Sequence, residues 1–290
     1  MKRKLAVSSM LLFAIFTFTG MSHAQKFRLK LSGGYGTMTT GDYNTFGAGL
    51  DDRLRTLEAL GATTEGEFNK INPGFEYEAE FILSLPAGFG VGVGFGYIQR
   101  SEMTELSASI PLVGSASASI DPKIKAIPIN ISAYYFTPGV APLKLFVYGG
   151  IGYYFGTLTT DIRESSTPPP FWSDQEGKLK DQSFGLHGGM GLEFEVAPRI
   201  ALFIEGRARY CKLKSWNGDA TYEDSDGFTG AEAGLMWYFE ELDQNYGSGE
   251  WFPGITIATG PPTSPDIRNA RKFEVNLSGV SLRTGIRIKF

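Results

Sequence analysis

FEYEAEFILSL, residues Phe75–Leu85, alternates apolar with other side chains along its whole length. The odd-numbered positions are apolar, and Glu76, Glu78 and Glu80 stand between the first of them. Because successive side chains of a β-strand point to opposite faces, the stretch predicts a strand with one apolar face and one acidic face. The architecture then depends on which face points into the protein.

The same period of two recurs in seven further segments, and many of them also carry charge opposite their apolar face. These segments are residues 27–35, 89–97, 127–135, 143–155, 184–196, 200–210 and about 273–290. The links between them alternate in length. Short links at 86–88, 137–142 and 197–199 alternate with long links at about 37–72, 100–122, 157–182 and 212–272. Short turns at one end and long loops at the other are typical of transmembrane β-barrels.

The apolar faces are long and rich in aromatic residues, so we expect them to face lipid and the charged faces to line an interior. A closed barrel satisfies every backbone polar group in a bilayer. The expected fold class is therefore all-β: a transmembrane antiparallel up-and-down barrel of eight strands with long extracellular loops. FTGAEAGLMWYFEE, residues 228–241, also alternates; we interpret it as a hairpin above the membrane, and ten strands is the alternative. LDDRLRTLEALG, residues 50–61, predicts a helix that lies across the barrel mouth.

The first 24 residues have the pattern of a secretory signal. Lys2, Arg3 and Lys4 precede an apolar run, and the small residues Ser22 and Ala24 fit a cleavage site. We expect residues 1–24 to be a signal peptide for Sec-type export and residues 25–290 to form one outer-membrane β-barrel domain.

Composition and motifs argue against several classes of protein. The net charge of −4 disfavours binding to nucleic acid, and a single cysteine excludes an internal disulfide. After the predicted signal only His187 remains as a histidine, and Ser183 lies four residues along the same strand, about 13 Å away. We therefore predict no catalytic residue, no cofactor and no metal site.

Three segments carry a family resemblance: AIPINISAYYF (126–136), KLFVYGGIGYYF (144–155) and LSGVSLRTGIRIKF (277–290). With the signal and the loop asymmetry, they resemble the small outer-membrane β-barrel family that contains OmpX- and OmpW-like proteins. The resemblance implies that Phe290, Ile288 and Ile286 form the signal read by the barrel-assembly machinery.

The charged faces predict the content of the lumen. An eight-stranded barrel is about wide enough for side chains to fill it, and unpaired buried charge is costly, so we expect a paired network. Lys144 and Lys289 share the inward face with it, and Arg28 and Lys30 should neighbour the Glu76–Glu80 row. The predicted network consists of Arg28, Lys30, Glu76, Glu78, Glu80, Glu193, Glu195, Glu205, Arg207, Arg209, Arg283 and Arg287. The alternative is a charged path for a small solute.

Three functions remain open at this point. The first is an integral protein of the bacterial outer membrane with a largely filled lumen and surface loops for binding, adhesion or envelope integrity. The second is a narrow channel for small or apolar solutes, as the OmpW-like resemblance implies. The third is an outer-membrane enzyme, either a lipid A-modifying enzyme or a protease. The expected partners are outer-membrane lipid, lipopolysaccharide, the assembly machinery and an extracellular ligand of the loops, and we expect a monomer.

Overall fold

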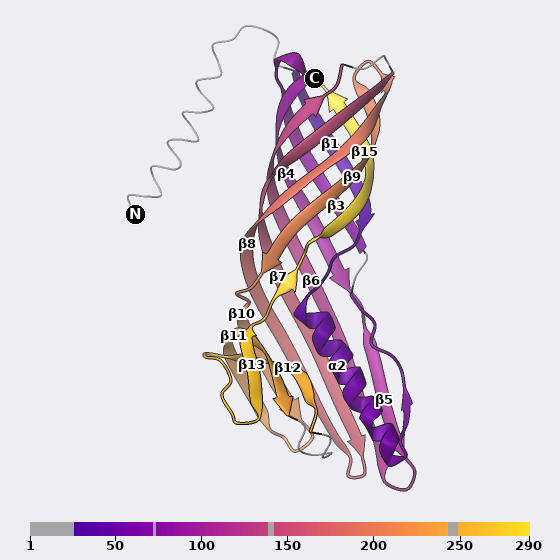
Figure 1. Ribbon diagram of the computed structural model, residues 1–290, viewed down its shortest axis with the longest axis vertical. Helices are drawn as coiled ribbons and strands as arrows, with labels where there is room; N and C mark the ends of the chain where they lie inside the picture. The colour runs from indigo at the N-terminus through magenta and orange to yellow at the C-terminus, as the bar shows by residue number, and fades with distance from the viewer. Residues whose placement is uncertain (1–25, 72–73, 139–141, 243–248) are drawn as a thin grey trace, which may run out of the picture.

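Eight antiparallel strands close into a ring in the computed structural model, which describes residues 26–71, 74–138, 142–242 and 249–290 (Figure 1). The ring closes because the first strand pairs with the last, with Leu31 opposite Ile286. This confirms the eight-stranded barrel, and the ten-stranded alternative is wrong. The predicted signal peptide lies outside the described residues. In order around the ring the strands are β1 (Lys26–Gly36), β3 (Gly74–Ser84), β4 (Phe89–Ser101), β6 (Gly114–Phe136), β7 (Leu143–Thr167), β8 (Phe171–Ala197), β9 (Ile200–Leu213) and β15 (Gly279–Lys289).

The short links lie at one end of the barrel, together with the start of β1 and the end of the chain (Figure 1). The link between β3 and β4 is a single turn of 3-10 helix, η3 (Pro86–Gly88). The link between β8 and β9 is shorter than the sequence suggests. The structure pairs Ala197 with Ile200 through a bulge after Glu195, whereas alternation alone pairs Val196 with Ile200.

At the other end β6, β7 and β8 continue far beyond the ring, with total lengths of 23, 25 and 27 residues. Two further strands pair with their distal parts, one with β6 and one with β8, and the remaining strands add to these, so the sheet continues from the barrel without a break. We call this part of the molecule the extension. Its own strands are β2 (Thr63–Glu65), β5 (Thr104–Ile110), β10 (Asn217–Asp224), β11 (Thr229–Leu242), β12 (Trp251–Ala258) and β13 (Ile267–Lys272), while β14 (Val275–Asn276) pairs with β9.

The long links at 100–122 and 157–182 are thus mostly strand, and their prediction as loops is wrong. Apolar and polar residues still alternate through both links, but the apolar residues move to the other face of the strand. A strand predicted from an outward apolar face therefore ends too early. The structure confirms that the alternating segment 228–241 forms a hairpin outside the ring, because β11 pairs with β10 and β10 pairs with β8.

The extension has its own apolar core, covered by helix α2 (Asp42–Thr56) and a following 3-10 turn, η2 (Leu57–Leu60). The helix begins eight residues earlier than predicted and runs along the sheet against β12 and β5, rather than across the barrel mouth. Arg271 fixes its start through a bidentate pair with Asp42, at 2.5 and 2.6 Å. Among the described residues, no helix is both long and apolar enough to cross a membrane.

Strand polarity reverses where the barrel meets the extension. On β6, Ile127, Ile129 and Ile131 point outward and are 36–52% exposed, although large apolar side chains normally avoid water. Lys125 and Lys123 lie on the same face, two and four residues before Ile127. The inward face changes in the opposite sense, from polar residues such as Asn130 in the barrel to buried Ile120 and Ile124 in the extension. The strand therefore has an apolar outside in the barrel and an apolar inside in the extension.

This reversal predicts where an outward charge is tolerated on β7. Ile151→Arg puts a charge in the apolar band, and we expect the free energy of unfolding in lipid vesicles to fall by about 2–4 kcal/mol. Thr159→Arg adds the same side chain beyond the band and should cost less than about 1 kcal/mol. Urea titration of both variants checks this, and equal losses would contradict the assigned band.

Candidate functional site

The candidate site is the lumen of the barrel, where charged side chains from six strands converge. The buried part of this set, among the residues that the structure describes, contains six cations and five carboxylates. They are Lys30, Arg100, Arg207, Arg209, Arg283 and Arg287 with Glu76, Glu78, Glu80, Glu193 and Glu205. Near-equal numbers of opposite charges allow pairing without a bound ion, which is what burial requires.

Glu78 stands at the centre of the network. It accepts hydrogen bonds from Arg207 at 2.5 Å and from Arg283 at 3.2 Å, and a third from the Asn130 amide at 2.7 Å. These partners come from β9, β15 and β6, so one carboxylate on β3 joins strands across the lumen. Next to this centre, Lys30 pairs with Glu205 at 2.9 Å. Charge-assisted bonds of this kind are the strong ones, and their removal leaves a buried charge without compensation.

Toward the extension, Glu76 pairs with Arg209 at 2.9 Å and lies 3.6 Å from Arg100. Arg100 is 2% exposed and donates to the Phe75 carbonyl at 2.7 Å. Arg100 was not predicted as part of the network, because it is the first residue of a predicted long link between strands. Its even number places it on the same inward face of β4 as the glycines of FGVGVGFGY, and this alternation could have indicated that Arg100 points into the lumen.

At the opposite end the network reaches the barrel rim. Glu193 bonds Arg287 and pairs with Lys289 at 2.9 Å, and Glu195 pairs with Lys144 at 3.3 Å. These contacts bring together β7, β8 and β15. Aromatic rings fill the space between the pairs, with the Arg287 guanidinium 4.5 Å from the centre of the Phe146 ring.

The structure separates Arg28 from Lys30. Lys30 lies opposite Glu80 in the register and 3.6 Å from its carboxylate, as expected. Arg28 lies opposite Ile82, and its guanidinium sits over the Phe136 ring at 4.2 Å, so it does not neighbour the Glu76–Glu80 row. The offset arises because the glutamate row ends at residue 80, one pair short of Arg28.

Neutral polar side chains complete the network and were not predicted. The Tyr134 hydroxyl donates to Glu80 and accepts a bond from Lys30 at 3.3 Å. Tyr134 also stacks with Tyr148 at 5.1 Å between ring centres. Both tyrosines lie at inward positions of strands that were predicted from their outward apolar residues. Alternation along these strands was therefore enough to predict that the two rings point into the lumen.

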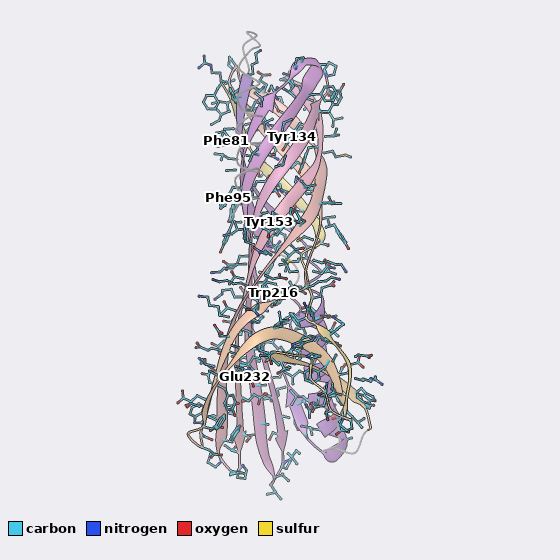
Figure 2. All side chains as sticks on the ribbon, turned by 90° about the vertical axis from the view of Figure 1, so that its left-hand side faces the viewer. Phe81, Phe95, Tyr134, Tyr153, Trp216 and Glu232 are labelled. Carbon is cyan, nitrogen blue, oxygen red and sulfur yellow. The ribbon has the colours of Figure 1, made fainter. Side chains whose placement is uncertain are left out.

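Apolar side chains close the lumen beneath the extension. Tyr154, Leu213 and Trp216 are each 0% exposed and belong to the core of the extension. Figure 2 shows Trp216 at the level where the barrel meets the extension, and Phe81, Phe95 and Tyr153 on the barrel. The charged lumen and the apolar core are therefore stacked along one axis.

One pair in the lumen has the composition of a catalytic dyad. The His187 imidazole lies 3.0 Å from the Ser132 hydroxyl, and this contact, unlike the distance from His187 to Ser183, was not considered from the sequence because it spans Gly150 on the strand between them. Both residues are buried, and His187 Nδ1 has no hydrogen-bond partner within the described residues. A catalytic histidine needs an orienting partner and a reachable substrate. Among the residues that the structure describes, no group of three or more His, Cys, Asp or Glu side chains could hold a metal ion.

The residues expected to guide assembly lie on the last strand. Ile286, Ile288 and Phe290 share its outward parity, and Phe290 is 69% exposed. The Phe290 backbone N–H donates to the Phe27 carbonyl at 2.8 Å, so the strand remains paired with β1 at its end.

Closed strand pairing, an apolar outside and a charged inside define an integral outer-membrane β-barrel. The chain belongs to the outer membrane protein beta-barrel domain family, whose model matches residues 8–239. Among curated proteins, none matches the chain. Solved structures to which the chain is similar include Neisserial surface protein A, 11% identical over 91% of this chain and 97% of that one, with a TM-score of 0.38. OprG of Pseudomonas aeruginosa is 10% identical over 92% and 96%, with a TM-score of 0.41. A major outer membrane protein of Thermus thermophilus is 13% identical over 92% and 100%, with a TM-score of 0.40.

The geometry of the network predicts unequal effects of removing its carboxylates. Glu78→Gln should lower the free energy of unfolding by about 3–5 kcal/mol, because Arg207 and Arg283 lose a buried partner. Glu195→Gln is the matched control at the rim, where the carboxylate is 26% exposed, and should cost about 1 kcal/mol or less. Unfolding in detergent micelles measures both, and a Glu78→Gln loss as small as the control's would contradict the network.

Proposed function

We propose that the protein is a closed outer-membrane barrel that anchors a folded extracellular domain, the extension, and that this domain binds a ligand at the cell surface. The short turns lie in the periplasm in this proposal, and residues 1–24 direct Sec-type export. The barrel is a monomer and has no catalytic role.

The burial of the lumen charges is the observation that carries this proposal. The walls of a water-filled channel remain accessible to water, whereas Lys30 and Arg287 are 0% exposed and Glu205 and Arg283 are 1% exposed. The apolar layer of Tyr154, Leu213 and Trp216 adds a second barrier toward the extension. An eight-stranded interior has about enough room for these side chains and little more.

Each alternative function requires a change in the closed lumen. A narrow channel for small or apolar solutes requires the network or the apolar layer to open. An enzyme that modifies lipid A or cleaves peptides requires access to Ser132 and His187, which are 3% and 6% exposed. We therefore retain surface binding as the function and treat conduction as an outcome of the test below.

We also propose that the outer leaflet contacts the barrel through four lysines just beyond the apolar band. Lys125 and Lys180 flank Thr157 in one row across β6, β7 and β8, and Lys123 and Lys178 flank Thr159 in the next. The row below them pairs Ile127 with Phe155, so the lysines stand at the height of lipid headgroups. Lipopolysaccharide carries phosphates that suit such a cluster.

A closed lumen predicts that purified protein in planar bilayers shows little or no steady conductance. Glu78→Gln should lower stability without producing a selective pore, because the surrounding side chains still fill the barrel. Single-channel recording tests both statements. Uniform, reproducible channels from the wild-type protein would overturn the proposal and assign the barrel to transport.

Assembly gives a separate prediction. We propose that the barrel-assembly machinery recognises Phe290, Ile288 and Ile286 on the last strand, because a strand end is readily captured by strand addition. Deletion of Phe290 should then reduce assembly in cells while refolding into detergent in vitro stays near wild type. The heat-dependent shift in gel migration reports both yields, and equal yields in cells would remove the assigned role.

A further inference from the structure

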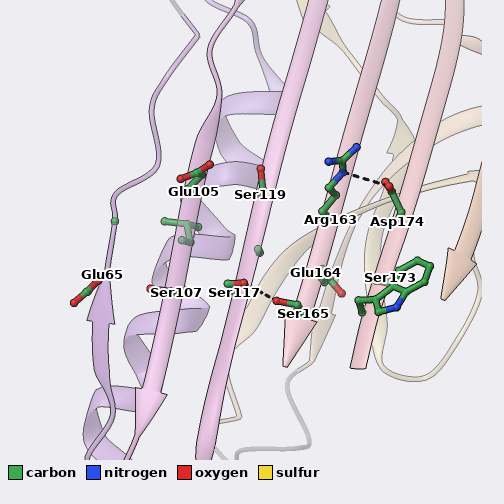
Figure 3. Close-up of a pocket in the computed structure, with 14 residues that line it drawn as sticks. Glu65, Glu105, Ser107, Ser117, Ser119, Arg163, Glu164, Ser165, Ser173 and Asp174 are labelled. Atoms are coloured by element: carbon green, nitrogen blue, oxygen red, sulfur yellow. Dashed lines mark hydrogen bonds and ion pairs between the residues drawn. The ribbon is translucent and has the colours of Figure 1, made fainter. Parts of the chain in front are cut away.

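The outer face of the extension carries an open groove of about 610 Å³, on the side of the sheet opposite helix α2 (Figure 3). We call it the serine groove. Its lining comes from β2, β5, β6, β7 and β8, and includes Ser107, Ser117, Ser119, Ser165 and Trp172. The groove is separate from the lumen and from the lysine cluster, so neither the anchor nor the lipid contact explains it.

The floor of the groove is one continuous row of the sheet. Pairing places Glu65 opposite Ser107, Ser107 opposite Ser117, and Ser117 opposite Ser165. Trp172 follows, opposite Ser165 on β8. Directly paired residues project on the same face of a sheet, so all these side chains line the groove. Small hydroxyls lie in the middle of the row, with a carboxylate at one end and an indole at the other.

A second row runs beside the first on the same face of the sheet and widens the floor. It contains Glu105, Ser119, Arg163 and Asp174, paired in that order. Arg163 lies 3.2 Å from Asp174 (Figure 3). It also lies 3.5 Å from Asp161, so its charge is already neutralised. Glu65 and Glu105 then leave the groove with an acidic character.

The hydroxyls and the indole suit different parts of a ligand. Ser117 and Ser165 bond each other at 2.8 Å, and each hydroxyl can both donate and accept, so they can exchange that bond for one to a ligand hydroxyl. Trp172 remains 44% exposed at the edge of this polar floor. A flat aromatic face covers the apolar face of a sugar ring well, and its N–H adds a polar handle.

We propose that the serine groove binds an oligosaccharide that carries no acidic group, with one ring against Trp172 and its hydroxyls over the serine floor. The volume falls within the range of about 300–1,000 Å³ that is typical of small-ligand sites, which suits a short oligosaccharide. Charge selects within this class. The carboxylates of Glu65 and Glu105 disfavour sulfated or carboxylated sugars and favour a sugar that carries a protonated amine. The inference rests on the proposed function, since it names the ligand class of the extracellular domain.

Binding of three probes to the full-length protein in detergent tests the proposal. The probes are a glucosamine tetramer, its N-acetylated counterpart and a heparin-derived tetrasaccharide, each titrated by calorimetry at low salt. We expect the glucosamine tetramer to bind most tightly and the N-acetylated tetramer to bind more weakly. The four lysines can hold sulfates outside the groove, so any binding of the heparin fragment should be unchanged in Trp172→Ala. Heparin binding that Trp172→Ala removes, or no binding of the other two probes, would overturn the proposal.

Two variants locate the site. Trp172→Ala should weaken binding about tenfold, and Ser117→Arg, which fills the middle of the floor, should abolish it. The matched controls are Phe228→Ala, an exposed aromatic residue elsewhere on the extension, and Thr159→Arg, on the same outer face but outside the groove. Both controls should bind within about twofold of wild type. If Ser117→Arg and Trp172→Ala bind as tightly as their controls, the groove is not the site.

Conductance of the same preparation separates the two proposals. If the protein shows no conductance and binds neither the glucosamine tetramer nor its N-acetylated counterpart, the groove assignment is wrong and the closed barrel stands. Steady channels would overturn the closed barrel, whatever the titrations show.

Discussion

A β-strand has only two faces, and in this protein the same strands run through two different environments, the barrel and the extension. In the barrel the outside meets lipid, and in the extension it meets water, so polarity must change sides along an unbroken ladder of backbone hydrogen bonds. The change falls within one residue pair across three strands. The row of Ile127 and Phe155 already carries Gln182 on β8, and the next row holds Lys125, Thr157 and Lys180. A larger offset between neighbouring strands would put a lysine among lipid tails or an apolar side chain in water.

The charged lumen follows from the same constraint. Lipid holds the apolar side chains outside, so an apolar interior would make the two faces alike and would leave the register of the strands poorly specified. Charges on the inner face remove that ambiguity, because a slip of one residue would turn Glu78 or Arg283 into the bilayer. Specificity has a stability cost, since buried ion pairs seldom stabilise more than well-packed apolar residues, and the network offsets that cost by giving Glu78 three donors.

The sequence predicts the barrel well because the barrel depends on local alternation. Eight segments, the inward position of Glu76 to Glu80 and the pairing of Lys30 with Glu80 all follow from parity and neighbouring strands. Contacts across the lumen, such as Glu78 with Arg207, depend on the curvature that closes the ring, and no local pattern encodes them. The contact of His187 with Ser132 instead depends on the register of three neighbouring strands, because the two residues lie in one row on either side of Gly150. The extension escaped prediction because Ile120, Ile124 and Leu158 carry the apolar face on the opposite parity, and because its core joins segments as distant as Tyr43 and Ile257.

Continuous strands also give the molecule mechanical properties. Ser117 lies on the same strand as Ile127, so the floor of the groove is joined to the lipid-embedded part by about 33 Å of fully paired β-structure and not by a hinge. A pull on a ligand held there would load many hydrogen bonds of β6, β7 and β8 together. The extension is therefore a stiff continuation of the barrel, and a sideways force on it would reach the barrel as torque.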